Sequence, residues 1–305
     1  MERYLGIDVG GTNTKSVALE YGGDGESVIE LGSVPTVVDA GPVGVRDQVV
    51  ALYRSHVAAV GAVKAVGVTI PGMVYVEAGT TGTVPNIAGD WLGFPMGGTI
   101  SDEIGLPVRL INDARAFSLA EATLGAARGV STVVCLTLGT GIGGGVVING
   151  KLWRGHTGMA GEIGHQTVDP SPDALVCGCG NPGCLETLTQ AEALCRRAGQ
   201  PDVEAVFAAA SAGDEKAREA LRAEFYYLAI GMANAYMLLA PDAFVIGGGI
   251  AQAGDAIRVP LMELVHSRLT MGAPDVVDIR CAELGSYAGA IGAALWAKDL
   301  PGTPS

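Results

Sequence analysis

The most specific chemical pattern in the sequence is one histidine followed by three closely spaced cysteines. His165 precedes Cys177, Cys179 and Cys184, and glycine and proline fill the spaces between the cysteines. Three thiolates and one imidazole form a complete tetrahedral ligand set for Zn²⁺. Such a set leaves no open position for water, so we expect a structural zinc site rather than a catalytic one. Three unrelated buried thiols are the alternative, which the tight spacing disfavours.

Two carboxylates flank this group of ligands. Glu162 lies three residues before His165, and Glu186 lies two residues after Cys184. Carboxylates accept two hydrogen bonds at once, which suits a ligand that carries several hydroxyl groups. Solvated surface glutamates are the alternative. The position beside the metal ligands favours sugar-binding residues.

Three glycine-rich turns can bind phosphate through backbone amides, because no Cβ blocks the approach of an anion. They are Asp8–Thr12, Leu138–Gly141 and Gly247–Gly249. Asp8 stands at a strand end and can hold Mg²⁺ directly or through water. Each turn alone can be an ordinary hairpin turn, but together they predict a polyphosphate site that is neither a Walker A loop nor a G-x-G-x-x-G motif. The residues expected to line it are Asp8, Gly10, Gly11, Thr12, Thr14, Lys15, Gly139, Thr140, Gly141, Gly247, Gly248 and Gly249.

A further carboxylate follows the apolar segment Val108–Ile111. Asn112 and Asp113 come directly after this predicted strand, at the end where α/β proteins place their ligands. Phosphoryl transfer needs a group that takes the proton of the attacking hydroxyl, and Asp113 can act as that base. On spacing alone, a plain helix cap is the stronger interpretation.

The elements that must position these residues alternate between strands and helices, which indicates an α/β fold. Residues 3–19 and 132–148 share one plan, an apolar strand, a glycine-threonine turn and a second apolar strand. This repeat predicts two hairpins in two domains of similar topology. We expect a smaller domain over residues 1–112, joined by a returning C-terminal helix at about 289–305, and a larger domain with the zinc site over 113–288. Further helices are predicted over 43–60, 100–104, 114–124, 202–212, 215–239, 253–269 and 288–297, and strands over 63–70, 108–111 and 243–246.

Composition narrows the range of partners. The chain has 305 residues and a net charge of −13, so an electrostatic nucleic-acid surface is not expected. The richest apolar window, 226–250, is broken by Asn234 and Pro241, so no membrane span is expected. The N-terminus shows no apolar core of a signal peptide, and the clustered cysteines indicate metal binding rather than disulfides. These features predict a cytoplasmic protein.

Taken together, these motifs resemble the ROK family (repressor, open reading frame, kinase), and most closely its glucokinase-type members. The resemblance covers residues 5–296, and the run Cys-x-Cys-Gly-x-x-Gly-Cys-x-Glu is its most specific part. The motifs that carry it are Asp8–Thr12, Pro71-Gly72, Pro85-Asn86, Asn112-Asp113-Ala114, Leu138–Gly141, Gly161–His165, Cys177–Gly180, Gly183–Glu186 and Gly247–Gly249.

The resemblance implies an actin-like ATPase (ribonuclease H-like) fold, with two similar domains around a cleft. It implies transfer of phosphate from ATP, with Mg²⁺, to the 6-hydroxyl of a hexose. Asp113 would be the base, His165 would contact both zinc and sugar, and family members suggest a homodimer or homotetramer. The remaining sugar contacts would come from Gly72, Asn86, Asn112, Glu162, His165 and Glu186.

Some alternatives stay open at this stage. Arg115 stands where many members of the family have Asn, and Asp90 interrupts the segment between Pro85-Asn86 and Trp91. These departures leave the acceptor sugar open. It can be glucose, N-acetylmannosamine, N-acetylglucosamine, fructose or kanosamine. A non-catalytic sugar sensor would not need Asp8 and Asp113, and an actin-like assembly protein would not need the zinc ligands. Repressor members of the family carry an N-terminal helix-turn-helix. Here the predicted phosphate-binding hairpin already begins at residue 3, so a repressor is not expected.

Overall fold

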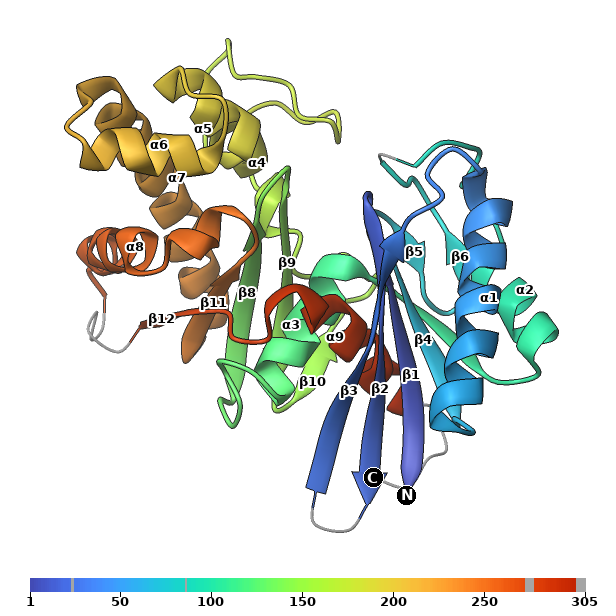
Figure 1. Cartoon of the computed structure of the whole chain (residues 1–305). Helices are drawn as coiled ribbons and strands as arrows, with labels where there is room; N and C mark the ends of the chain where they lie inside the picture. Colours follow the sequence, from blue (N-terminus) through green and yellow to red (C-terminus); the bar gives the residue numbers. More distant parts are fainter. Residues whose placement is uncertain (23–24, 86, 272–276, 300–305) are drawn as a thin grey trace. The chain divides into compact units, whose positions relative to one another are not determined.

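A computed structural model of the chain describes residues 1–22, 25–85, 87–271 and 277–299 (Figure 1). These residues form two compact units. The first comprises Met1–Glu121 and the C-terminal segment from Leu284, and the second comprises Ala122–Glu283. Asn86, which was expected to contact the sugar, lies outside the described residues.

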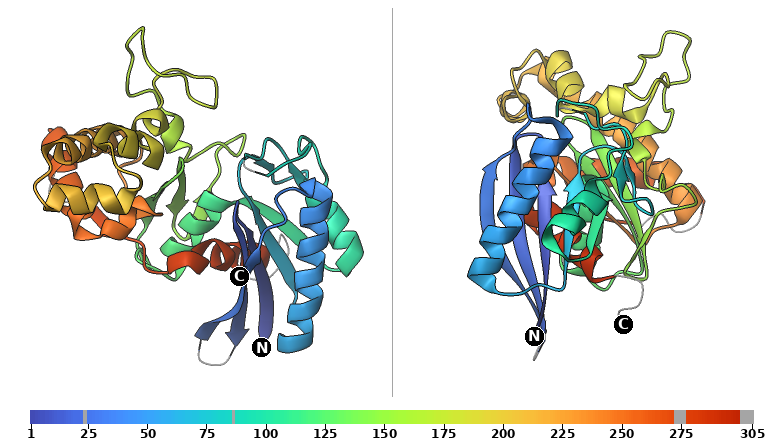
Figure 2. Two further views of the ribbon diagram at one scale, coloured as in Figure 1. Left: turned by 45° about the horizontal axis from the view of Figure 1, so that its top comes forward. Right: turned by 90° about the vertical axis from the view of Figure 1, so that its right-hand side faces the viewer.

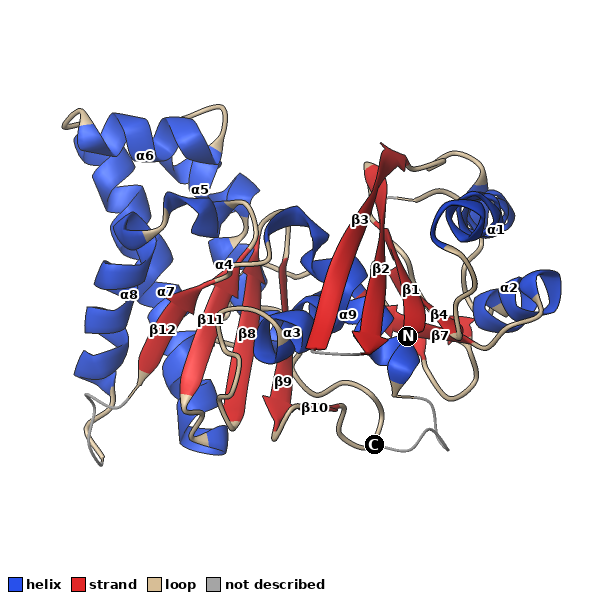
Figure 3. Cartoon of the chain, turned by 60° about the horizontal axis from the view of Figure 1, so that its bottom comes forward, coloured by secondary structure: helices blue, strands red, loops and turns tan. Residues whose placement is uncertain are grey.

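The sheet of the first unit has the strand order β3–β2–β1–β4–β7 (Figure 3). β1, β2 and β3 pair antiparallel, and β1, β4 and β7 pair parallel. Side chains alternate between the two faces of a strand, and both faces here are covered by helices. The strands are β1 (Glu2–Val9), β2 (Asn13–Gly22), β3 (Gly25–Pro35), β4 (Ala65–Ile70) and β7 (Val108–Asn112), beside a small hairpin of β5 (Val74–Tyr75) and β6 (Thr80–Thr81).

Helices α1 (Gly41–Val60) and α2 (Met96–Ile104) share one hydrophobic core with the sheet of the first unit. Helix α9 (Ala288–Lys298) packs on the other face, against β1 and β4 (Figure 2). Helix α3 (Asp113–Thr123) continues directly from β7, and the 3-10 helix η4 (Gly285–Tyr287) leads into α9.

Two glycines allow α9 to lie unusually close to the sheet. A Cβ on Gly6 would stand 1.9 Å from the carbonyl oxygen of Ala290, and a Cβ on Gly67 would stand 1.8 Å from that of Ala293. Any side chain at either position would therefore push the helix away. Gly6 and Asp8 share a strand face, so this close packing also fixes the helix next to Asp8.

The sheet of the second unit has the strand order β10–β9–β8–β11–β12. β8, β9 and β10 pair antiparallel, and β8, β11 and β12 pair parallel. The long helix α7 and helix α8 bury their apolar sides in one core with β8 and β11. The elements are β8 (Thr132–Leu138), β9 (Ile142–Ile148), β10 (Lys151–Trp153), β11 (Ala243–Gly247), β12 (Asp278–Cys281), η1 (Ile163–His165), η2 (Ile250–Ala253), α4 (Leu185–Thr189), α5 (Ala191–Ala198), α6 (Val203–Ser211), α7 (Glu215–Leu239) and α8 (Asp255–Arg268).

The two sheets therefore repeat one topology, an antiparallel three-stranded meander extended by two parallel strands. This confirms the α/β class, both predicted hairpins and the similarity of the two halves. The prediction for α7 matches its bounds, Glu215–Leu239. Helix α2 begins at Met96, four residues before the expected start at residue 100. Among the described residues, no helix is long and apolar enough to cross a membrane.

Several short or exposed elements had no counterpart in the sequence prediction, among them β3, β12 and α5. β3 is a mostly exposed edge strand, and its polar composition lacks the alternation that marks a half-buried strand. β12 has only four residues. Helix α5 has eight residues, and its apolar positions are small except for Leu194. Short elements carry too few positions for a periodic signal.

Candidate functional site

The carboxylate of Asp8 lies at the end of β1, on the face that α9 covers. Thr69 Oγ1 donates to Asp8 Oδ1 at 2.5 Å. Burial raises the pKa of Asp8, against the lowering effects of this hydrogen bond and of the Lys15 charge. A Cβ on Gly289 would stand 2.6 Å from Asp8 Oδ2, so a glycine in the first turn of α9 makes room for the carboxylate.

The first glycine-rich turn joins β1 to β2. Gly11 and Thr12 are exposed at its tip, where their amides can meet an anion. Thr14, expected to donate to phosphate, is instead buried, and its hydroxyl lies 2.9 Å from Thr36 Oγ1. Thr36 Oγ1 in turn donates to the carbonyl of Gly10 at 2.8 Å. The geometry places Thr14 behind the turn, as part of its support.

Lys15 pairs with Asp8 across the two strands, and its ammonium group donates to the carbonyl of Ser286 at 3.0 Å. The cation therefore ties the turn before α9 to β2. Its positive charge also acts to lower the pKa of Asp8, although burial raises that pKa overall.

Asp113 is held by the residues around it at the start of α3. Asn112 Nδ2 donates to Asp113 Oδ1 at 2.8 Å and also to the carbonyl of Gly72 at 2.9 Å. The backbone N–H of Ala114 donates to the same Oδ1 at 2.9 Å. These bonds fix the plane of the carboxylate. Asn112 Oδ1 accepts from the N–H of Arg115 at 3.2 Å, so Asn112 also caps the helix.

Gly72 supplies its carbonyl from a conformation that suits glycine alone. Its φ is 94°, and a Cβ would stand 2.3 Å from the carbonyl oxygen of Thr83. The Pro71-Gly72 motif therefore serves to orient Asn112, and through it Asp113.

The pKa of Asp113 is raised to about 6, first by burial and second by the negative charge of Asp8. Backbone N–H donors and the Arg115 cation act in the opposite direction. A carboxylate with a pKa near the operating pH is suited to accept a proton from a hydroxyl group. Asp113 is therefore held in one place by hydrogen bonds and has a pKa that suits proton transfer.

In the second unit, the turn between β8 and β9 contains Gly139, Thr140 and Gly141, with the N–H of Gly139 donating to the carbonyl of Gly141 at 3.1 Å. Gly247 ends β11 and is buried. Gly248 has a φ of 85°, and a Cβ there would stand 2.4 Å from the carbonyl of Leu138. The second and third glycine-rich segments therefore lie side by side.

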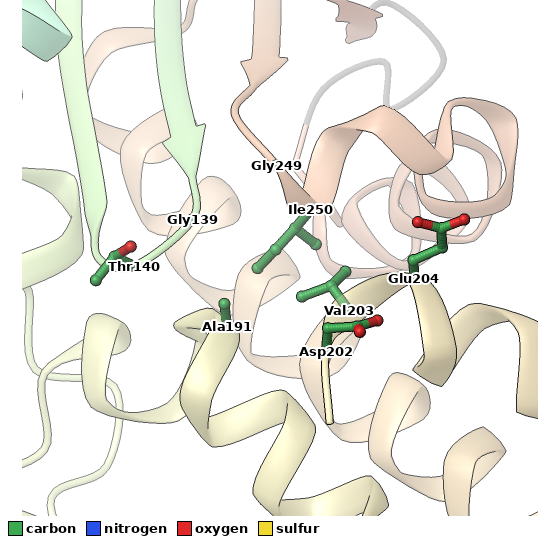
Figure 4. A pocket seen from close by; sticks show the side chains of 8 residues that line it. All are labelled: Gly139, Thr140, Ala191, Asp202, Val203, Glu204, Gly249 and Ile250. Carbon is green, nitrogen blue, oxygen red and sulfur yellow. The ribbon is translucent and has the colours of Figure 1, made fainter. Parts of the chain in front are cut away.

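These two segments line a pocket of 400 Å³ in the second unit (Figure 4). Thr140 stands at the hairpin tip, and the start of α6 forms the wall at the other end. The lining residues are Gly139, Thr140, Ala191, Asp202, Val203, Glu204, Gly249 and Ile250. Of these, Ala191, Asp202, Val203, Glu204 and Ile250 were not predicted as site residues. Asp202 caps α6 by accepting from the N–H of Ala205 at 2.8 Å, but a helix start alone does not reveal a pocket wall.

The structure brings all four predicted metal ligands together, and we refer to His165, Cys177, Cys179 and Cys184 as the Cys/His cluster. One ligand atom from each lies within 4.8 Å of the others. Four ligands around a tetrahedral Zn²⁺ are about 3.7 Å apart for two sulfurs, and slightly closer for sulfur and nitrogen. Cys179 Sγ and Cys184 Sγ are 3.7 Å apart, and Cys177 Sγ is 3.5 Å from His165 Nδ1. The donor set and its spacing fit Zn²⁺.

Protons compete with a metal ion for the thiols of this cluster. Burial raises the pKa of Cys177 to about 12. A metal ion must therefore displace a proton from this thiol, and metal binding at the cluster becomes weaker at low pH.

Glu162 and Glu186 both lie against the cluster. Glu162 Oε2 is 3.8 Å from His165 Nε2, so the imidazole presents Nδ1 to the thiols and Nε2 to Glu162. Glu186 Oε2 accepts from the backbone N–H of Ile142 at 2.8 Å, and Oε1 lies 3.6 Å from Cys177 Sγ. The expected sugar contacts Glu162, His165 and Glu186 are thus close to one another in the second unit, whereas Gly72, Asn112 and Asp113 are grouped in the first.

Comparisons with known proteins show which family and which structures the chain resembles. The sequence pattern of the ROK family matches residues 4–300. A glucokinase of Halalkalibacterium halodurans is 33% identical over 312 residues, covering 95% of this chain and 93% of that protein. The ROK hexokinase of Thermus thermophilus superposes with a TM-score of 0.85 at 35% identity, with 97% of both chains covered. A ROK family glucokinase from Streptomyces griseus, solved with glucose and AMPPNP, superposes with a TM-score of 0.79 at 32% identity, covering 97% of this chain and 99% of that chain.

Proposed function

Because the chain belongs to the ROK family, we propose that it transfers the γ-phosphoryl group of ATP to the 6-hydroxyl of a hexose, with glucose as the acceptor. The observation that carries this proposal is the carboxylate of Asp113. Its Oδ1 is fixed by Asn112 and Ala114, and its pKa is about 6. Asp113 accepts the proton of the attacking hydroxyl, so that the oxygen can displace ADP from the γ-phosphorus.

The nucleotide is assigned to the glycine-rich segments. In the second unit, the pocket beside Gly139, Thr140 and Gly249 takes the nucleotide, with phosphate groups on the amides of the hairpin turn. In the first unit, the exposed amides of Gly11 and Thr12 are further phosphate donors. Asp8 holds the Mg²⁺ that accompanies ATP, directly or through water.

The Cys/His cluster is assigned to Zn²⁺, which holds the surrounding segments in place without an open coordination position. His165 uses Nδ1 for the metal, because that nitrogen faces Cys177. Nε2 then remains for a sugar hydroxyl, together with Glu162. Zinc therefore orients sugar ligands without taking part in the transfer.

A kinase for an amino sugar such as N-acetylmannosamine is the second candidate, because buried Arg115 follows Asp113 closely on α3 and differs from the residue common in the family. We expect a cytoplasmic protein, in keeping with the clustered thiols, and a homodimer or homotetramer, as the resemblance to the family implies. The choice of acceptor sugar and the oligomeric state do not alter the proposed transfer of the phosphoryl group.

The test is ADP release from Mg-ATP by zinc-loaded protein across a panel of hexoses and amino sugars, with a sample that contains no sugar. The proposal predicts strong turnover with glucose and little ADP release without sugar. Strong turnover with one amino sugar only would select the second candidate. Folded, zinc-loaded protein that turns over none of the sugars would contradict a hexose kinase.

A further inference from the structure

Ile142, the residue that follows the second glycine-rich turn, contacts the chain beside two ligands of the Cys/His cluster, Cys184 and His165. Ile142 donates its backbone N–H to Glu186 Oε2 at 2.8 Å, and Glu186 lies two residues after the ligand Cys184. A Cβ on Gly164, the residue before His165, would stand 2.2 Å from the carbonyl oxygen of Ile142. The peptide groups on both sides of Ile142 are therefore packed against residues that neighbour the cluster ligands in the chain.

Gly141, in the turn itself, leaves room for the Glu186 carboxylate. A Cβ on Gly141 would stand 2.5 Å from Glu186 Oε2, so the absent side chain leaves the space that the carboxylate fills. The other carboxylate oxygen, Oε1, lies 3.6 Å from Cys177 Sγ. One side chain thus connects the turn with a cluster ligand.

The same segment of chain also holds the beginning of the turn. Helix α4 follows Cys184 directly and leads into α5, whose first residue, Ala191, donates its N–H to the carbonyl of Gly139 at 2.8 Å. The two helices are joined by a hydrogen bond from the N–H of Gln190 to the carbonyl of Glu186 at 2.9 Å. The segment from Cys184 to Ala191 therefore contacts both ends of the turn.

From these contacts we infer that Glu186 is a positioning residue for the nucleotide, in addition to any contact with the sugar. Its carboxylate links the Cys/His cluster to the turn and so orders the amides of Thr140 and Gly141, which contribute to the affinity for the donor's phosphates. This inference rests on the assignment of that turn to ATP. It gives the cluster an effect on the nucleotide that does not require a sugar to be present.

The test measures the dissociation constant for ADP by calorimetry, without sugar, in zinc-loaded protein. Removing a hydrogen bond to a charged group weakens the fixed geometry, so E186A is expected to raise the Kd for ADP about tenfold. E186Q keeps an oxygen that accepts from Ile142 and is expected to restore most of the affinity. E219A, which removes an exposed glutamate of α7, is the matched control and should bind ADP like the wild type.

Amide hydrogen exchange provides a second readout on the same samples. Residues 139–142 should exchange faster in E186A than in the wild type and E186Q, whereas a residue that acts only on the sugar would leave this segment unchanged. If E186A does not fold, E186D keeps the charge but shortens the reach, and it should also bind ADP more weakly. Unchanged ADP affinity and unchanged exchange in both variants, with lower sugar affinity, would overturn the inference. Wild-type protein that does not bind ADP would instead contradict the proposed function itself.

Discussion

The two glycine-rich hairpin turns share a strand plan but differ in what supports them. Behind the first turn, neutral hydroxyl groups of Thr14 and Thr36 form a buried network that ends on the carbonyl of Gly10. Behind the second turn stands the carboxylate of Glu186, next to a thiol of the Cys/His cluster. The first support is complete within the folded core, whereas the second adjoins the cluster that we assign to a metal ion.

The two turns share a backbone plan, but they are expected to respond differently to metal removal and to pH. Uncharged hydrogen bonds buried in a core do not change with metal supply or with moderate changes of pH. The thiols and the imidazole of the Cys/His cluster lie within 4.8 Å of one another, and a metal ion that binds them would hold their segments together. Order in the second turn is therefore expected to follow metal occupancy, and order in the first is not.

Metal removal should produce the largest difference in order between the two turns. Structural zinc contributes roughly 10 kcal/mol or more to the folding of small domains, so its loss should loosen the segments around the Cys/His cluster. We expect amide exchange in residues 139–142 to accelerate at least tenfold after chelation, with residues 10–14 unchanged. Exchange that rises equally in both turns, or in neither, would show that the two supports do not differ in this way.

A smaller effect is expected from the substitution T36V, which removes the hydroxyl that bridges Thr14 and Gly10. The loss of buried hydrogen bonds should lower the free energy of unfolding by about 1–2 kcal/mol, measured by urea denaturation. T157V, at an exposed loop position, is the control. The variant should change exchange in the first turn and leave the second as it is, and a reversed pattern would contradict the assignment of supports.

Features that depend on neighbouring residues could be predicted from the sequence, whereas contacts between distant segments could not. The hairpins, the four cluster ligands and the position of Asp113 after a strand follow from local patterns, and the structure places them accordingly. Residue type indicated that Thr14 would face phosphate, but it faces Thr36, because only the fold decides which way a strand residue points. The pocket wall at Asp202 and Glu204 and the contact of Glu186 with Ile142 join segments distant in the chain, which no local pattern reveals.

The smallest predicted effect concerns pH. Asp113 has a pKa of about 6, and the proposed base must be ionised to accept a proton, so kcat/KM should fall as the pH drops through about 6. The Arg115 cation lowers this pKa, so R115M should move the acid limb toward higher pH, by less than about one unit. Rate profiles of folded wild type and R115M measure the shift. An acid limb that stays in place or moves to lower pH would show that Arg115 does not act on the base.

The most direct test of the account is the rate of phosphoryl transfer from Mg-ATP to glucose in a single turnover, compared between the wild type and D113N. The account predicts that the asparagine variant, which cannot accept the proton, forms glucose 6-phosphate at least ~100-fold more slowly. Its Kd for ADP should stay at the wild-type value, since the pocket to which we assign the nucleotide lies in the second unit. A variant that retains the full rate would contradict the role of Asp113 as the general base.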